Sequence, residues 1–143
     1  MSKMDWNSLL HENLTAYNKE NIKICDFKEP VILFFTSLSC VHCIDLLPNL
    51  NEISDLDTQA KIILFSDGEI EEIADMRQYF NWEFTVIPYD DAEKQNLFTD
   101  LKFPFMAKFD EHKNLITQGT IYNTDDYKAA MNHMEAMNFI ERR

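Results

Sequence analysis

Glycine and proline are scarce in this sequence, with only two and four residues among 143, and no segment is rich in either. This scarcity argues against flexible linkers and collagen-like repeats, so we expect one domain spanning residues 1–143. The composition also argues against disorder, because 45% of the residues are hydrophobic and 13% are aromatic. Such a chain can bury a core without disulfide or metal cross-links.

Basic residues are few as well. Thirteen Lys and Arg stand against 25 Asp and Glu, which gives a formal net charge of −12. A negative field of this size repels phosphate backbones and anionic lipids, so we expect neither nucleic acid nor a membrane surface as a partner. The longest apolar run, Val31 to Phe35, is too short to cross a bilayer, and the polar N-terminus does not resemble a secretory signal. We therefore expect a cytoplasmic monomer.

Cysteine occurs only three times, at Cys25, Cys40 and Cys43. In a reducing compartment this number argues against a structural disulfide framework, and a close pair is then more typical of catalysis or metal binding. Cys40 and Cys43 form such a pair in the segment "FFTSLSCVHC". The sequence thus draws attention to one C-x-x-C motif.

Helical and extended patterns alternate along the chain. Two apolar runs, "VILFFT" at 31–36 and "KIILFS" at 61–66, predict strands buried on both faces. Helical periodicity predicts helices over 5–18, 40–54 with a kink at Pro48, about 68–80, about 91–101 and from Thr124 to the end. Shorter extended segments are expected over 22–27 and 84–87, and a β-hairpin after Pro104.

This order predicts an α/β fold with a central mixed β-sheet flanked by helices. Strands connected through helices are expected to be parallel, and the hairpin adds antiparallel strands. Residues 1–20 would form an extra N-terminal helical extension.

The position of Cys40 suggests its chemistry. At the first turn of a helix, its sulfur meets unpaired backbone N–H groups and the positive end of the helix dipole, which favours the thiolate. Cys43 lies one turn later and is expected to be more buried, so it would resolve a mixed disulfide formed at Cys40. His42 between them, if protonated, would support the thiolate and raise the redox potential.

Three other interpretations stay open for these residues. His42 could be an ordinary solvated side chain. The cysteine pair could bind zinc, although tetrahedral sites usually take four ligands, and the remaining candidates are scattered: Cys25, His11, His112 and His133. The pair could also be chemically silent on an interaction module.

From about Ile22 to the C-terminal helix, the chain resembles the thioredoxin superfamily. The resemblance is carried by "VILFFT", the motif "CVHC", Pro48 five residues after the second cysteine, and "FPF" ahead of a hairpin. The longer spacer before Pro104 is more similar to bacterial cytochrome-maturation and peroxiredoxin-like thioredoxins. The resemblance implies a redox-active Cys40–Cys43 disulfide, no cofactor, and a cis-Pro104 that faces the dithiol. It also implies that Val41, the Phe103 backbone and Pro104 contact the substrate.

The chain departs from thioredoxin itself at two positions. Phe34 and Ser39 stand where that family has a buried acid and a tryptophan, so an acidic proton acceptor for Cys43 is expected to be missing. The x-His-Cys ending resembles periplasmic disulfide oxidants, although Val41 replaces their proline.

Together these features predict a thiol–disulfide oxidoreductase with a dedicated protein or peptide client. One example of such a task is forming or isomerising a disulfide in a ribosomally made peptide. Its electron partner would be a thioredoxin reductase or a small thiol. The alternative from another class is a non-catalytic thioredoxin-fold module that binds an extended peptide.

Overall fold

The structure, a computed structural model, describes residues 5–90 and 101–141, with side chains described as far as residue 132. The short helix expected over 91–101 lies in a segment outside these residues. Among the described helices, none combines the length and the hydropathy that crossing a membrane requires.

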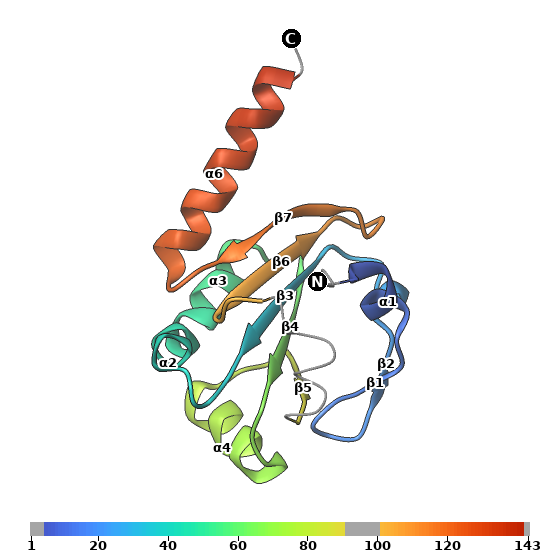
Figure 1. The fold of residues 1–143 in the computed structure, drawn as a ribbon, viewed down its shortest axis with the longest axis vertical. Coiled ribbons are helices and arrows are strands. Elements are labelled where there is room, and N and C mark those ends of the chain that lie inside the picture. Colours follow the sequence, from blue (N-terminus) through green and yellow to red (C-terminus); the bar gives the residue numbers. More distant parts are fainter. Residues whose placement is uncertain (1–4, 91–100, 142–143) are drawn as a thin grey trace.

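A mixed β-sheet forms the centre of the molecule (Figure 1). Within the described residues it has five strands in the order β5-β4-β3-β6-β7. β3, β4 and β5 are parallel, whereas β6 and β7 are antiparallel to their neighbours. Their bounds are Val31–Thr36, Lys61–Ser66, Thr85–Pro88, Phe105–Phe109 and Leu115–Thr120 for β3 to β7. The predicted mixed sheet and its terminal hairpin are both confirmed.

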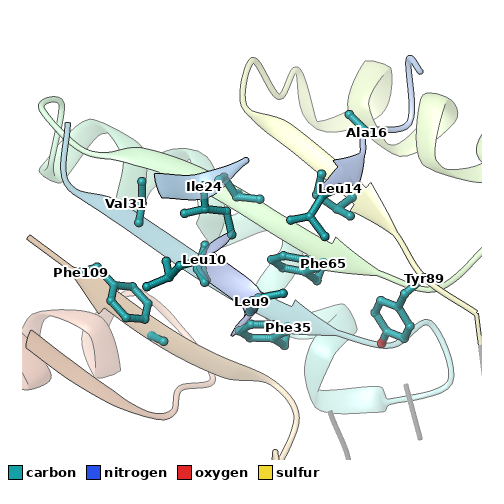
Figure 2. Close-up of a cluster of buried hydrophobic side chains, with 14 residues drawn as sticks. Leu9, Leu10, Leu14, Ala16, Ile24, Val31, Phe35, Phe65, Tyr89 and Phe109 are labelled. Carbon is teal, nitrogen blue, oxygen red and sulfur yellow. The ribbon is translucent and has the colours of Figure 1, made fainter. Parts of the chain in front are cut away.

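Helices cover both faces of this sheet, because the central strand β3 is apolar on both sides. Leu33 and Phe35 pack on one face with residues of the N-terminal segment, in the cluster that Figure 2 shows. Ile32 and Phe34 pack on the opposite face. The helices there are α2 (Val41–Leu46), α3 (Leu50–Leu56), α4 (Ile70–Phe80) and α6 (Thr124–Glu141).

The N-terminal segment differs from the predicted helix over 5–18. The helix α1 spans only Trp6–His11, and the chain then forms a two-residue strand β1 (Leu14–Thr15) that pairs with β2 (Asn21–Ile22). The Tyr17 N–H donates to the Val86 carbonyl oxygen, 3.0 Å away, so extended backbone here bonds beside the sheet. The strand expected over 22–27 is correspondingly short and gives way to the 3₁₀ turn η1 (Ile24–Asp26).

Pro48 interrupts the helix that follows the cysteines, as predicted. The helical path changes from α2 to the 3₁₀ turn η2 (Leu47–Asn49) and continues as α3. Proline has no N–H to donate and clashes with the carbonyl one turn earlier. The cysteines thus lie on a short helix of their own, backed by the buried side chains of Leu46 and Leu47.

A buried polar cluster joins α6 to the rest of the fold. Lys108 on β6 is 9% exposed, and its ammonium group forms an ion pair with Asp57 at the end of α3. The ammonium also donates to the Tyr127 hydroxyl (3.3 Å) and to the Met131 sulfur (3.4 Å) on α6. Tyr127 in turn donates to Asp57, 3.2 Å away. All three elements therefore share one charge-assisted network.

Candidate active site

The ends of three strands bring the candidate residues to one edge of the sheet. β3 and β4 are parallel and stay in register as far as Thr36 and Ser66, so the residues that follow leave the sheet side by side. β6 runs the other way and begins opposite Phe35. Pro104, which directly precedes β6, therefore lies at the same edge as the turn that leads to Cys40.

Cys40 is the N-cap of α2 and is partly exposed. Its sulfur accepts a hydrogen bond from the Cys43 N–H, 3.3 Å away, and its own N–H donates to the Ser37 carbonyl oxygen (3.1 Å). The sulfur thus satisfies one of the amide donors that a helix leaves unpaired at its start.

Cys43 lies one turn further into α2 and is only 1% exposed. Burial is the main cause that raises the pKa of its thiol from 9.0 to about 12. The hydrogen bond with Cys40 and the negative charges of Cys40 and Asp67 act in the same direction, whereas a hydrogen bond from the Ser37 backbone opposes them. Both cysteines are free thiols here, so this is the reduced form of the pair.

Asp67 is an acidic neighbour of the pair that the sequence did not lead us to expect. It follows β4, and its carboxylate accepts hydrogen bonds from the Ser37 hydroxyl and the Leu38 N–H, both at 2.7 Å. Its charge also acts on Cys43. Phe34 is fully buried in the core. The Asp67 carboxylate bonds to Ser37 and Leu38, so the expectation that Cys43 has no acidic proton acceptor stays a prediction.

His42 and Val41 lie on the outer side of α2. The His42 ring is edge-on to Tyr122, with 5.1 Å between the ring centroids. Val41 is 74% exposed, and Ile44 and Tyr122 are also large exposed side chains. This places apolar surface directly beside Cys40. The role of His42 in setting the redox potential stays a prediction.

The segment before β6 has the backbone geometry that the resemblance implies. The peptide bond between Phe103 and Pro104 is cis. Pro104 is buried, and its carbonyl oxygen accepts a hydrogen bond from the Ile121 N–H (3.1 Å). The Phe103 ring is partly buried and lies 6.5 Å from the Tyr89 ring.

The third cysteine stands apart from the pair. Cys25 lies in η1, before the start of β3, whereas Cys40 follows the other end of that strand. It is partly exposed, with its sulfur 4.0 Å from an Asp26 carboxylate oxygen. The 3₁₀ turn buries Ile24 and directs the next side chain outward. Among the described residues, no three His, Cys, Asp or Glu side chains gather as a metal site would require.

Two residues at this edge, Asp67 and Tyr89, were not singled out from the sequence. Each follows a strand of the parallel set, and Tyr89 donates from its hydroxyl to the Thr36 carbonyl oxygen. Figure 2 shows Tyr89 at the end of the buried cluster, beyond Phe65. Their position in the sequence could have indicated this, because polar residues that directly follow neighbouring parallel strands meet at one edge of a sheet.

Comparison by sequence finds no matching protein-family model and no matching curated protein. Comparison by structure finds a secreted disulfide oxidoreductase of Mycobacterium tuberculosis, homologous to Escherichia coli DsbE, with a TM-score of 0.71 at 12% identity. The match covers 91% of this chain and 98% of that one. The chain therefore has the thioredoxin-like fold. Two further matches are a thioredoxin-like protein from Aeropyrum pernix (TM-score 0.69, 14% identity, 87% of this chain and 89% of that one covered) and StoA from Bacillus subtilis (TM-score 0.63, 14% identity, 84% and 93% covered).

Proposed function

We propose that this thioredoxin-like protein is a thiol–disulfide oxidoreductase that uses Cys40 as its nucleophile and Cys43 as its resolving thiol. One observation carries the proposal: the Cys40 sulfur caps α2 and is partly exposed, while Cys43 is buried directly behind it. This asymmetry gives the two sulfurs different tasks. The activities named for the structural neighbours agree with it.

The reaction follows from thiol–disulfide exchange. The Cys40 thiolate attacks one sulfur of a client disulfide, so a Cys40–client disulfide forms and the other client sulfur leaves as a thiolate. Cys43 then loses its proton and attacks the Cys40 sulfur, which releases the second client thiolate and forms the Cys40–Cys43 disulfide. Two electrons have passed from the protein to the client. Run in reverse, the same steps oxidise a client, and the direction is set by the relative potentials.

The exposed apolar side chains beside Cys40 support a protein or peptide client. Val41, Ile44 and Tyr122 together offer a surface that an extended peptide could cover, and the backbone near Phe103 and Pro104 is the proposed site of strand-like pairing. We propose a dedicated client, for example a ribosomally made peptide that matures by disulfide formation or isomerisation. A thioredoxin reductase or a small thiol would return the pair to its starting state.

An activity assay with cysteine variants tests this proposal. The measured reaction is reduction of insulin by dithiothreitol, paired with oxidation of a dithiol peptide by glutathione disulfide. We expect Cys40→Ser to abolish both and Cys43→Ser to trap a mixed disulfide at Cys40. Cys25→Ser is the matched control, because Cys25 lies at the other end of β3. Inactivity of the wild type, or full activity of Cys40→Ser, would sink the proposal.

The non-catalytic alternative is a peptide-binding module, and the exposed apolar surface beside Cys40 favours it as the second candidate. It predicts that capture of a client survives the double variant Cys40→Ser/Cys43→Ser. Metal analysis of protein purified without chelators tests a zinc-binding pair. A cytoplasmic location and a monomeric state remain part of the proposal, tested by fractionation of cells and by light scattering.

A further inference from the structure

The turn that leads into the dithiol is held by one side chain from the neighbouring strand. Asp67 follows β4 and accepts hydrogen bonds from the Ser37 hydroxyl and the Leu38 N–H, both at 2.7 Å. Because Thr36 and Ser66 pair in parallel register, Ser37 and Asp67 are the first residues beyond the paired strands. Their contact is therefore built into the register of the sheet.

Ser37 transmits this contact to the cysteines. Its hydroxyl bonds the Ser39 hydroxyl (2.9 Å) and accepts from the Ser39 N–H (3.3 Å). Its carbonyl oxygen accepts from the Cys40 N–H (3.1 Å), and the Cys40 sulfur in turn accepts from the Cys43 N–H (3.3 Å). Ser37 is 1% exposed, so water does not compete freely for these bonds. Asp67 thus fixes the turn from which both sulfurs are positioned.

Asp67 also contributes a negative charge that acts on Cys43, whose thiol must ionise in the second step of the exchange. The charge of Asp67 disfavours the Cys43 thiolate, as a smaller cause than burial and the neighbouring Cys40. We propose that Asp67 is a positioning residue of the dithiol, which fixes the Ser37–Ser39 turn and, through its charge, delays the attack of Cys43 on a mixed disulfide at Cys40. This inference rests on the proposed oxidoreductase function and deepens it.

The consequence is a longer-lived mixed disulfide. In the resolving step Cys43 gives its proton to solvent, its sulfur bonds to the Cys40 sulfur, and the client leaves as a thiolate. The rate of this step depends on the fraction of Cys43 present as thiolate. By lowering that fraction further than burial alone does, Asp67 gives a bound client more time before it is released. A dedicated client with several cysteines would gain time for exchange among its own thiols.

The test separates the charge of Asp67 from its hydrogen bonds. Asp67→Asn removes the charge, while its amide can still accept from Leu38 and donate to Ser37. Ser37→Ala keeps the charge and removes the hydroxyl bond. Glu71→Gln, an exposed carboxylate in the first turn of α4, is the matched control for charge alone. All variants are made in a Cys25→Ser background, so that only the pair reacts.

The probe is 5,5′-dithiobis(2-nitrobenzoate), mixed with reduced protein at neutral pH. Attack by Cys40 releases one coloured thiolate, and attack by Cys43 on the resulting mixed disulfide releases a second. In Asp67→Asn we expect roughly threefold more Cys43 thiolate, partly offset by its lower nucleophilicity, so the second release becomes about twofold faster. Glu71→Gln and Ser37→Ala should not accelerate it, although Ser37→Ala should lower the melting temperature.

An unchanged or slower second release in folded Asp67→Asn would overturn the inference, and so would equal acceleration by Glu71→Gln. Asp67→Ser provides a second neutral variant. If neither neutral variant folds, the inference also fails, because it holds that the charge is separable from the fold. Failure of the proposed function looks different: the wild type itself would then release no second thiolate.

Discussion

The buried Cys43 thiol should be far less reactive than an ordinary thiol when the reduced protein is alkylated at pH 7.5. The reason is the environment of this residue, which is 1% exposed and follows Cys40 by one turn of α2. Burial first, and the neighbouring sulfur second, raise the pKa of this thiol from 9.0 to about 12. Alkylation requires the thiolate, so a rarely ionised thiol reacts slowly.

The size of the effect follows from this pKa. A rise of about three units lowers the thiolate fraction at neutral pH about a thousandfold. A more basic thiolate is also a better nucleophile, which recovers roughly 20-fold at a Brønsted coefficient of about 0.4–0.5. Cys43 should therefore react roughly 50-fold more slowly than an ordinary exposed thiol, and burial of the sulfur slows it further.

The assay uses substoichiometric iodoacetamide, followed by quantification of the three cysteine peptides by mass spectrometry. Partly exposed Cys25 serves as the internal reference within each sample. We expect alkylation to concentrate at Cys40, with Cys43 nearly unlabelled until the protein is denatured. Equal initial labelling of Cys43 and Cys25 in the folded protein would refute the reasoning.

Three further predictions concern the frame of the site. Asp57→Asn leaves the Lys108 charge without its partner and should destabilise the protein by about 2–3 kcal/mol in urea unfolding; no loss would contradict the network. Gly68→Ala should cost about 1–3 kcal/mol, because φ is +115° and a Cβ would lie 2.7 Å from the Leu38 side chain. Burial and the Asp57 charge raise the pKa of Tyr127, so unfolding free energy should fall as pH rises above about 10, and less steeply in Tyr127→Phe.

Much of the central sheet could be predicted from the sequence. "VILFFT" and "KIILFS" became β3 and β4 with the predicted bounds, because runs that are apolar on both faces suit strands covered on two sides. The interruption at Pro48 also followed from local chemistry alone. These features depend on few contacts between distant residues, so the local sequence pattern was enough to predict them.

The N-terminal segment shows where local patterns fail. Leu10, Leu14 and Tyr17 have helical spacing, yet the helix ends at His11 and Leu14 pairs with Ile22. The extended conformation is favoured over the helix here, because it lets the Tyr17 N–H bond to β5 and buries Leu14 in the core. Helical spacing cannot reveal such a competing tertiary contact.

The site itself was only partly predictable. The cysteines and Pro104 stand out as a motif, but the link between Ser37 and Asp67 depends on the register of two strands that are 30 positions apart in the chain. Phe34 in β3 gives no hint of the Asp67 carboxylate, because Asp67 follows the neighbouring strand β4. The register of β3 against β4 had to be known before Ser37 and Asp67 could be predicted to lie together.

The most direct test of the central claim is a redox titration of the Cys25→Ser protein in glutathione buffers of graded potential. The fraction of oxidised protein is read by alkylation and mass spectrometry after quenching with acid. We predict one two-electron transition, with the oxidised form carrying an intramolecular Cys40–Cys43 disulfide, and its absence in Cys40→Ser and Cys43→Ser. Protein that stays reduced throughout, or that forms only glutathione adducts, would contradict the account.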